Sequence, residues 1–452
     1  MRNLLRTAGA IVLALLPAGC ATRGALHFDC KGFDHYVHNL EPSKLVRDIQ
    51  SDAVTDVDLL SGDTALASDI DPMANSIAAL LAPDGPRSDK DPRSTLLLSG
   101  GGQWGAFGAG FLGRLHDQAA DPAHADRYPD FGVITGVSTG GLQALFVAIG
   151  DAEAYRDLRT HYAPKSEKEI VDRNPTWQAV ATGSVAGLAP LRRKIEAVLC
   201  HGGDPAKECK VIEQLAASGT KVYIGFVEAS SGRFVYADVV AIANDAKAGP
   251  TGLESRRNAQ QCLTGVAMAS AAMPVFFQQV KIGPHAYYDG GVRQSVFEVR
   301  VAELMQQASA RALEAAAARK RSGDSAPDAA THSSFAEPSL YVVRNGPTIL
   351  EPDHKADDAA DALTAAFRAE AIVVNELEVS SIAALRLARP TGPIRLVTAD
   401  GWKKSSPVCD KPPGVMFDPD FMACLQTFGI AKASRPVPWI SLREITGVRK
   451  KQ

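Results

Sequence analysis

The sequence lacks an excess of basic charge, because its 48 Lys and Arg residues are outnumbered by 51 Asp and Glu residues. A clustered basic surface is the electrostatic signature of nucleic-acid binding, so no nucleic-acid partner is expected. The chain contains 46% hydrophobic and 22% charged residues over 452 positions. This composition is typical of a folded globular protein, and the length allows one large domain with additions or two domains.

The N-terminal apolar stretch is too short for a transmembrane helix, which needs about 20 residues. Arg2 and Arg6 precede this stretch, which covers residues 8–16 and is followed by small residues up to Gly19. Positive charge, a short apolar run and small residues, in this order, indicate a secretory signal peptide. The sequence therefore predicts a signal peptide over residues 1–19 and export of the remaining chain.

Cys20 follows the small residue Gly19 and resembles the lipobox cysteine of bacterial lipoproteins. The resemblance implies lipidation of Cys20 and attachment to the membrane through it. With Ala21 next in the chain, it implies a place at the bacterial outer membrane, facing the periplasm. Pro17 departs from the pattern, which usually has Leu at that position. The alternative is an ordinary cleaved signal peptide in which Cys20 has no special role.

Six further cysteines are an even number, which in an exported chain is consistent with disulfides. Cys200 and Cys209 bracket a short polar loop, and Cys409 and Cys424 bracket a loop rich in Pro and Asp. We expect these to be two disulfide pairs. Cys262 is as well explained by a buried free thiol.

Breaker residues divide the chain into an N-terminal extension and a main domain. Residues 83–92 are rich in Pro, Asp and Gly, which indicates that residues 20–92 form an extension and linker. The main domain is expected over residues 93–445, with a mobile polar loop at 319–337. Apolar runs alternate with helical patterns in this domain, as in α/β proteins with a mostly parallel sheet.

Gly136-Val137-Ser138-Thr139-Gly140 is a Gly-x-Ser-x-Gly sequence between a predicted strand, 133–135, and a predicted helix, 142–149. A nucleophilic serine occupies such a sharp strand-to-helix turn, where crowding requires glycine on both sides. The following helix directs the positive end of its dipole at the site. The alternative is a glycine-rich turn with a surface serine.

Gly100, Gly101 and Gly102 follow the predicted strand 94–98 and open another helix. Such a loop can direct backbone N–H groups at a phosphate or at the oxyanion of an acyl-transfer intermediate. The loop lacks the Gly-Lys-Ser/Thr ending of a P-loop, and its match to a dinucleotide-binding pattern is weak by itself. A serine nucleophile on the next strand favours the oxyanion hole.

The base that would activate Ser138 is less evident. Five histidines follow Ser138, and none has a distinctive position: His161, His201, His285, His332 and His354. Asp289 comes directly after a short strand and precedes Gly290 and Gly291, which allow an immediate turn. A buried carboxylate can accept the serine proton directly. An ordinary Asp-Gly turn is the alternative.

In this order, the Gly100–Gly102 loop, the Ser138 turn and Asp289-Gly290-Gly291 resemble the patatin-like phospholipase family. The segment 269–277, Ala-Ser-Ala-Ala-Met-Pro-Val-Phe-Phe, resembles the family's Ala-Ser-x-Ala-x-Pro motif ahead of the aspartate. The resemblance covers residues 94–300 by motif and extends more loosely to about 430. It implies a patatin-like three-layer α/β/α fold with a mostly parallel central sheet.

The resemblance also implies a Ser138–Asp289 dyad without catalytic histidine, a Gly100–Gly102 oxyanion loop, an acyl-enzyme, and no metal or cofactor. The expected activity is hydrolysis of fatty-acyl esters of phospholipids, lysophospholipids or other lipids. Trp104 stands where the family usually has Arg or Lys, which favours an apolar ester or lysolipid over a phosphate headgroup. Residues 150–220 are expected to contribute to a lid or acyl pocket, with Leu188–Leu191 among the candidate lining.

Three alternatives remain open at this level. A Ser–His–Asp esterase would need one of the five histidines. A lipid-anchored binding protein would carry the motifs without activity. An acyltransferase would use the same dyad and pass the acyl group to an alcohol.

Overall fold

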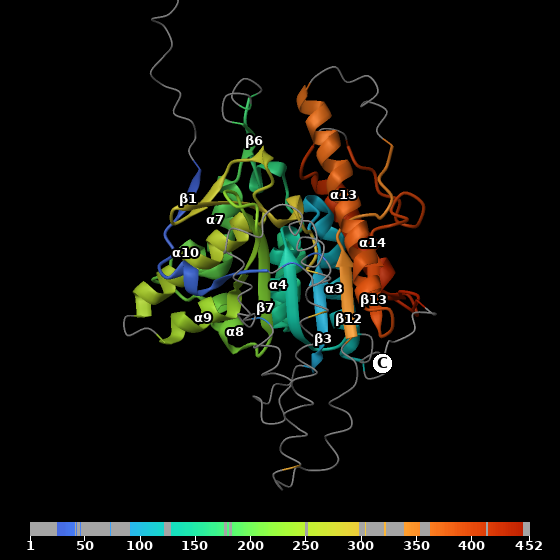
Figure 1. The fold of residues 1–452 in the computed structure, drawn as a ribbon, viewed down its shortest axis with the longest axis horizontal. Helices are drawn as coiled ribbons and strands as arrows, with labels where there is room; N and C mark the ends of the chain where they lie inside the picture. The colour runs from blue at the N-terminus through green and yellow to red at the C-terminus, as the bar shows by residue number, and fades with distance from the viewer. Residues whose placement is uncertain are drawn as a thin grey trace, which may run out of the picture.

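The Gly-rich loop and the serine turn follow two neighbouring parallel strands of a large central sheet, which Figure 1 shows with helices around it, and Leu98 pairs with Gly136 near the ends of these strands. The computed structural model describes residues 25–40, 91–121, 128–175, 183–248, 252–297, 339–352, 362–412 and 415–445, with Pro42, Val46, Met73, Ala179, Glu303 and Arg321. The signal peptide, Cys20, and the predicted linker and mobile loop lie outside these residues, apart from the last residues of the linker, 91 and 92, and Arg321.

The sheet has eleven strands among the described residues, and its main path runs β1-β10-β11-β7-β4-β3-β12-β13-β14. The five strands at its centre pair in parallel: β7 (Lys221–Glu228), β4 (Phe131–Val137), β3 (Asp91–Leu98), β12 (Ser339–Arg344) and β13 (Ile394–Thr398). Strands towards both edges pair mostly antiparallel: β8 (Phe234–Asp238), β10 (Val280–Ile282), β11 (His285–Asp289) and β14 (Ile440–Ser441). The mostly parallel centre agrees with the prediction, since the buried central runs are Val-, Ile- and Leu-rich.

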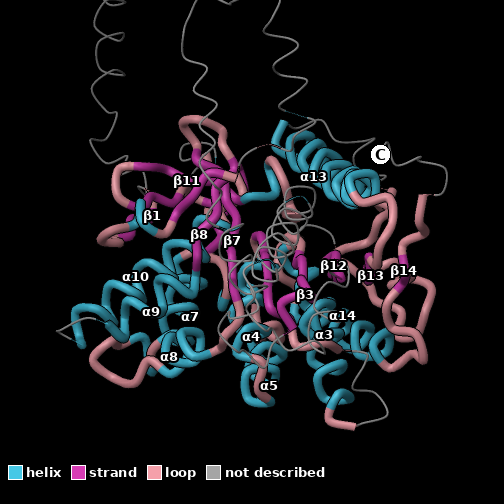
Figure 2. Tube along the Cα trace, turned by 60° about the horizontal axis from the view of Figure 1, so that its bottom comes forward, coloured by secondary structure: helices cyan, strands magenta, loops and turns pink. Residues whose placement is uncertain are grey.

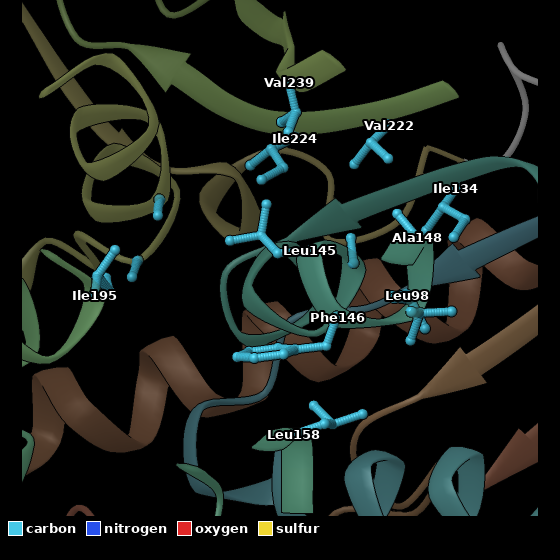
Figure 3. Packing of buried hydrophobic residues seen from close by; sticks show 14 of the residues in the cluster. Leu98, Ile134, Leu145, Phe146, Ala148, Leu158, Ile195, Val222, Ile224 and Val239 are labelled. Atoms are coloured by element: carbon cyan, nitrogen blue, oxygen red, sulfur yellow. The ribbon is translucent and has the colours of Figure 1, made fainter. Parts of the chain in front are cut away.

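Helices cover both faces of the sheet. Successive residues of a strand point to opposite sides, so each central strand contributes side chains to the core on each face. Leu96, Leu98 and Ile134 point into the larger core, and Leu97 and Val133 into the smaller one. The larger core is filled by α3 (Gly105–Ala119), α4 (Thr139–Ile149), α5 (Ala152–His161), α7 (Ala189–Leu199), α8 (Lys210–Ala217), α9 (Val239–Ala248), α10 (Gly252–Ser270) and α14 (Pro419–Ala433). Figure 3 shows Leu145 and Phe146 of α4 between strand residues and Leu158 of α5.

Helix α13 (Ala362–Ala388) covers the other face, where Ile382 and Leu385 join the smaller core. Figure 2 shows α13 on the opposite side of the strands from α3, α4 and α5. The three layers are therefore helices, sheet and helix, as the resemblance implied. Among the helices of the described residues, none has the length and apolar character needed to cross a bilayer.

Part of the predicted N-terminal extension belongs to the central sheet. Strand β1 (Leu26–Phe28) pairs in parallel with β10, and β2 (Val37–Asn39) pairs antiparallel with β8. A disulfide between Cys30 and Cys262 attaches this segment to α10. Cys262 is therefore half of a third disulfide, not the buried thiol that was the alternative.

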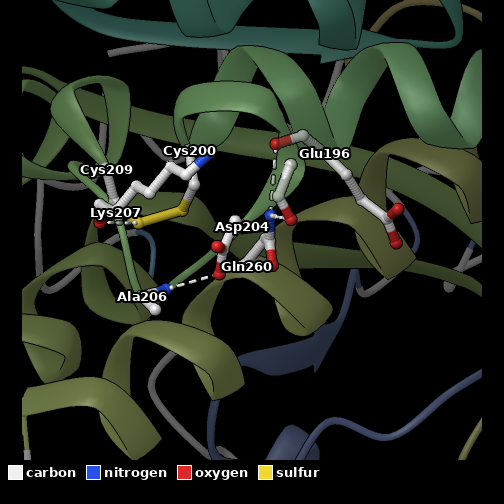
Figure 4. Close-up of a disulfide and its surroundings, with 8 residues drawn as sticks. Glu196, Cys200, Asp204, Ala206, Lys207, Cys209 and Gln260 are labelled. Carbon is white, nitrogen blue, oxygen red and sulfur yellow. Dashed lines mark hydrogen bonds between the residues drawn. A yellow bond between two sulfur atoms is a disulfide. The ribbon is translucent and has the colours of Figure 1, made fainter.

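The two predicted disulfide pairs are both present. Cys200 bonds to Cys209 and closes the loop between α7 and α8, and Cys409 bonds to Cys424 on α14. Figure 4 shows Gln260 of α10 beside the first of these loops. Its amide donates hydrogen bonds to the carbonyl oxygens of Glu196 (3.1 Å) and Gly203 (3.0 Å), which fixes the loop against α10.

A second, small sheet lies beside the first and has the order β5-β6-β9 among the described residues. Its strands are β5 (Asp172–Arg173), β6 (Ser184–Gly187) and β9 (Val275–Phe277). Strand β9 directly follows the Ala269–Pro274 motif, so this sheet connects the 150–220 segment to the region around Ser138. No pattern in the sequence predicts these very short strands.

Candidate active site

Ser138 occupies the turn between β4 and α4. Its backbone has φ 53° and ψ −125°, a left-handed conformation that a non-glycine residue adopts only when its surroundings enforce it. A β-carbon on Gly136 would collide with the backbone at Gly140, and one on Gly140 would collide with the carbonyl groups of Leu98 and Ser99. The glycine pattern of this turn therefore follows from crowding, as the sequence argument required.

The Ser138 hydroxyl lies near enough to the carboxyl group of Asp289 to act on its pKa. Asp289 is the last residue of β11 and is 2% exposed. Burial raises its pKa to about 7, even though the nearby Ser138 hydroxyl and the hydrogen bond from the Gly291 N–H (2.7 Å) act to lower it. A carboxyl group with this pKa is half ionised near neutral pH and is a much stronger base than a solvated aspartate.

The Ala269–Pro274 segment holds both members of this pair. The Ser138 N–H donates to the Ser270 hydroxyl (2.7 Å), which in turn donates to the Gly225 carbonyl of β7 (2.7 Å). The Asp289 N–H donates to the Ala272 carbonyl oxygen (3.0 Å). One short segment at the end of α10 therefore sets the position of the serine turn relative to the aspartate.

The Gly-rich loop passes beside Ser138, and its three glycines have different roles. The Gly100 N–H already donates to two oxygen atoms of Ser295, its hydroxyl (3.1 Å) and its carbonyl (3.3 Å). Gly100 therefore does not supply the oxyanion donor expected of it. Within the described residues, no hydrogen bond engages the N–H groups of Gly101 or Gly102. Gly102 lines the same pocket as Ser138, which leaves these two as the candidate oxyanion donors.

Asn345, just after β12, holds the loop from its other side. Its side-chain amide donates to the Ser99 carbonyl oxygen (2.8 Å) and to the Gln143 side chain (3.0 Å). Gln143 of α4 donates to the Gly105 carbonyl oxygen (2.7 Å). Gly101 has φ 139° and lies so close to the Asn345 backbone that no β-carbon would fit. The loop is thus fixed at both ends before any substrate binds.

An apolar pocket opens at Ser138, with a volume of about 890 Å³ when its open mouth is included. The pocket runs between α4 and α7, which contribute Leu142, Leu145, Phe146, Leu191, Lys194, Ile195, Val198 and Leu199. Leu188 also lines the pocket, as the sequence suggested for this segment. The Lys194 ammonium group reaches out of the apolar wall to the His161 carbonyl oxygen (3.3 Å), so its alkyl stem contributes to an otherwise apolar lining.

The histidines that could have formed a triad lie in other surroundings. His161 lines the pocket but stacks on Phe146, and burial lowers its pKa. His285 is half exposed beside Glu228, and His201 is on the surface. His332 and His354 lie outside the described residues. Of Asp289 and the described histidines, Asp289 is the residue on whose pKa the Ser138 hydroxyl acts.

Trp104 packs edge-on against Trp402 and Phe421 and is not part of the pocket lining. The position where the family usually has a cation is therefore filled by an aromatic cluster next to the Gly-rich loop. No group of three or more His, Cys, Asp or Glu residues within the described ranges could hold a metal ion.

Two carboxyl groups of α13 act on the site although no sequence motif predicts them. Glu378 is buried and its pKa is raised by burial, and Glu370 has a pKa raised to about 7 by burial and by the charge of Glu378. Both raise the pKa of Asp289 through their negative charge. The available signal was Glu378 itself, a charged residue on the same helical stripe as the core residues Ile382 and Leu385.

Comparison with known proteins agrees with this geometry. The family model described as patatin-like phospholipase matches residues 96–299, from β3 past the turn at Asp289. No curated protein matches the chain. VipD from Legionella pneumophila, a solved structure, has a TM-score of 0.34 and 11% identity, over 75% of this chain and 66% of that chain. The family model spans the Gly-rich loop, the Ser138 turn and Asp289 together, so residues 96–299 are similar to the patatin-like phospholipase family.

Proposed function

We propose that this protein is a serine lipid acyl hydrolase that uses a Ser138–Asp289 dyad and an acyl-enzyme intermediate. The observation that carries the proposal is the juxtaposition of a strained, pocket-lining serine with a buried aspartate whose pKa is raised to about 7. The nucleophile and the candidate oxyanion donor Gly102 line one apolar pocket, and the candidate base lies beside the nucleophile, which is the arrangement that ester hydrolysis needs.

In the first half-reaction, the Ser138 oxygen attacks the ester carbonyl carbon while Asp289 accepts the hydroxyl proton. The carbonyl oxygen becomes an oxyanion, which the N–H groups of Gly101 and Gly102 would stabilise with the dipole of α4. The tetrahedral intermediate then collapses, and protonated Asp289 returns the proton to the leaving alcohol. An acyl group remains on Ser138.

In the second half-reaction, Asp289 removes a proton from a water molecule that attacks the acyl-enzyme. Collapse of the second tetrahedral intermediate releases the fatty acid and returns the proton to Ser138. An alcohol in place of water would give acyl transfer by the same steps, so the balance between the two depends on which acceptor reaches the acyl-enzyme.

The pocket supports a fatty-acyl substrate. Its walls are almost entirely apolar, so they favour a hydrocarbon chain over a polar acyl group. Trp104 in place of a cation beside the loop favours lysophospholipids or neutral esters over substrates that depend on a phosphate contact there. We therefore propose activity of the lysophospholipase or esterase type within the carboxylic ester hydrolases.

We also propose that the protein is exported and lipid-anchored through Cys20. The support is the order of residues 1–20 and the three disulfides, which persist in oxidising compartments. An anchor at Cys20 would keep the pocket close to bilayer lipid, its proposed source of substrate.

Labelling with a fluorophosphonate, followed by peptide mapping, tests the nucleophile. Wild type should be labelled on Ser138 and should hydrolyse a short-chain ester and a lysophospholipid, whereas Ser138→Ala should do neither. Ser231→Ala, which changes an exposed serine of the β7–β8 turn, is the matched control and should behave as wild type. Failure of the wild type to react with either ester or probe would favour a binding protein with inactive motifs.

A further inference from the structure

A continuous chain of polar contacts connects α13 to the Gly-rich loop. The Gly100 N–H donates to the Ser295 hydroxyl (3.1 Å), the Ser295 hydroxyl donates to Glu378 Oε1 (2.5 Å), and Arg344 Nη2 pairs with Glu378 Oε2 (2.9 Å). Ser295, Arg344 and Glu378 are 1%, 2% and 3% exposed. The three side chains are thus removed from water, and their contacts with one another replace hydration.

Ser295 is placed where it can restrain both halves of the site. It lies six residues after Asp289, just beyond the 3-10 turn η6 (Gly290–Val292). A methyl group added to Gly100 would lie 2.7 Å from the Ser295 hydroxyl oxygen and 3.4 Å from the Ser138 β-carbon. The start of the Gly-rich loop is therefore held between Ser295 on one side and the nucleophile on the other.

A purely structural role does not account well for this arrangement. Glu378 shares its helical stripe with Ile382 and Leu385, where an apolar side chain would pack against the smaller core without any cost of charge burial. Arg344 offsets only part of that cost, because its Nε and Nη1 atoms have no hydrogen-bond partner among the described residues. The Glu378 carboxylate accepts a directional hydrogen bond from Ser295, and Ser295 in turn accepts one from Gly100.

We propose that Ser295 and Glu378 are positioning residues that hold the Gly100 end of the oxyanion loop in its catalytic conformation. Glu378 does not line the pocket, so it acts through Ser295 and not on the substrate. The inference rests on the proposed function, because it assigns a purpose to the loop that the hydrolase mechanism uses. It adds α13 and β12, which lie outside the family match, to the elements that shape the site.

The decisive variant is Ser295→Ala, because it removes the link and leaves the Arg344–Glu378 ion pair intact. The matched control is Ser94→Ala, which removes another buried serine hydroxyl in the middle of β3. Ser295→Thr keeps a hydroxyl and tests for rescue. Thermal unfolding of all three variants shows which of them fold as the wild type does.

Two readouts are needed for each variant: kcat and KM for a short-chain ester, and hydrogen exchange of the backbone amides in residues 96–104. For Ser295→Ala we expect kcat to fall about tenfold or more with little change in KM, since a misplaced donor affects the transition state more than ground-state binding. Exchange of the loop amides should accelerate by roughly fivefold to tenfold, the effect of one lost hydrogen bond. Ser94→Ala should change neither, and Ser295→Thr should restore most of the turnover.

Unchanged kcat in a folded Ser295→Ala variant, or a fall that Ser94→Ala reproduces, would overturn the inference. If the wild type hydrolyses no ester, the proposed function fails, and the exchange measurement alone then decides the inference. Unchanged exchange in residues 96–104 would in that case reject it, and accelerated exchange confined to this loop would support it.

Discussion

Asp289 shows how the environment of a single residue can set its chemistry. Its carboxyl group accepts a hydrogen bond from the Gly291 N–H and lies near the Ser138 hydroxyl, and both groups favour the ionised form. Burial and the negative charges of Glu370 and Glu378 outweigh these two effects and raise the pKa to about 7. The residue is therefore ionised often enough to act as a base at neutral pH and basic enough to take a serine proton.

Activity should consequently rise with pH through about 7 as Asp289 loses its proton. Glu370 titrates in the same range and its negative charge raises the pKa of Asp289, so the rise belongs to the coupled pair. Glu370→Gln should move the midpoint of the kcat/KM profile to lower pH. Glu376→Gln, an exposed change on the same helix, should leave the profile unchanged. A wild-type profile that is flat between pH 5 and 9 would contradict the assignment of Asp289.

The same pKa predicts a stability effect. A carboxyl group whose pKa is higher in the folded than in the unfolded state binds more protons when folded, so stability falls as pH rises from about 4 to about 7. Asp289→Asn removes this loss. The difference in the free energy of unfolding between the variant and wild type should therefore shift in favour of the variant from pH 4.5 to pH 8, by roughly 4 kcal/mol at most. Denaturant unfolding at the two pH values measures the difference, and an identical pH dependence of both proteins would refute the buried, raised-pKa carboxyl.

At the scale of elements, two helices shape the substrate pocket. Helix α4 extends from Ser138 and lines the pocket with residues three and four apart, and α7 faces it in the same way. The lined stretch covers about eight residues of each helix, or roughly 10–12 Å at the rise of an α-helix. The pocket therefore suits one acyl chain lying along the two helices.

A larger side chain in this wall should shorten the accepted chain. Val198→Phe places extra volume in the pocket, and Ala197→Phe places it on the exposed face of the same helix. We expect Val198→Phe to lower kcat/KM for a long-chain ester about tenfold or more while a short-chain ester is spared, because the lost burial is that of the distal methylene groups. Ala197→Phe should affect neither. An equal loss on both substrates would show that the acyl chain binds elsewhere.

The elements of this pocket and of the sheet differ in how far the sequence predicts them. The apolar runs 94–98 and 133–135 are predicted to within a few residues of β3 and β4. Burial on both faces makes these runs continuous, which is an unambiguous signal. The three-residue strands β1, β2 and β9 are too short for any periodic pattern, and only their pairing partners define them.

At the scale of the whole molecule, the sequence predicts the candidate nucleophile, base and oxyanion loop better than the residues that hold them in position. Local glycine patterns indicate the Ser138 turn, the Gly-rich loop and Asp289. Ser295 and Glu378 have no such pattern, because their role depends on where α13 meets the sheet. Asp289 and Glu378 are far apart in the sequence, on β11 and α13, so only the fold reveals that their charges interact.

The three disulfides constrain loops of very different length. Cys30–Cys262 spans 232 residues, whereas Cys200–Cys209 spans 9. Loop-closure entropy predicts a loss of about 5 kcal/mol on removal of the first and about 3 kcal/mol on removal of the second. Cys30→Ala/Cys262→Ala should therefore lower the unfolding midpoint more than Cys200→Ala/Cys209→Ala. The reverse order would show that the N-terminal segment contributes little to the stability of the domain.

The central claim is that Asp289, and not a histidine, activates Ser138. The most direct test is kcat/KM on a short-chain ester for wild type, Asp289→Asn and His161→Ala, the histidine that lines the pocket. The account predicts a loss of about a thousandfold or more for Asp289→Asn, in line with removal of the base from a serine hydrolase. It predicts that His161→Ala retains most of its activity. Near-normal turnover by Asp289→Asn, or its abolition by His161→Ala, would contradict the dyad and point to a histidine base.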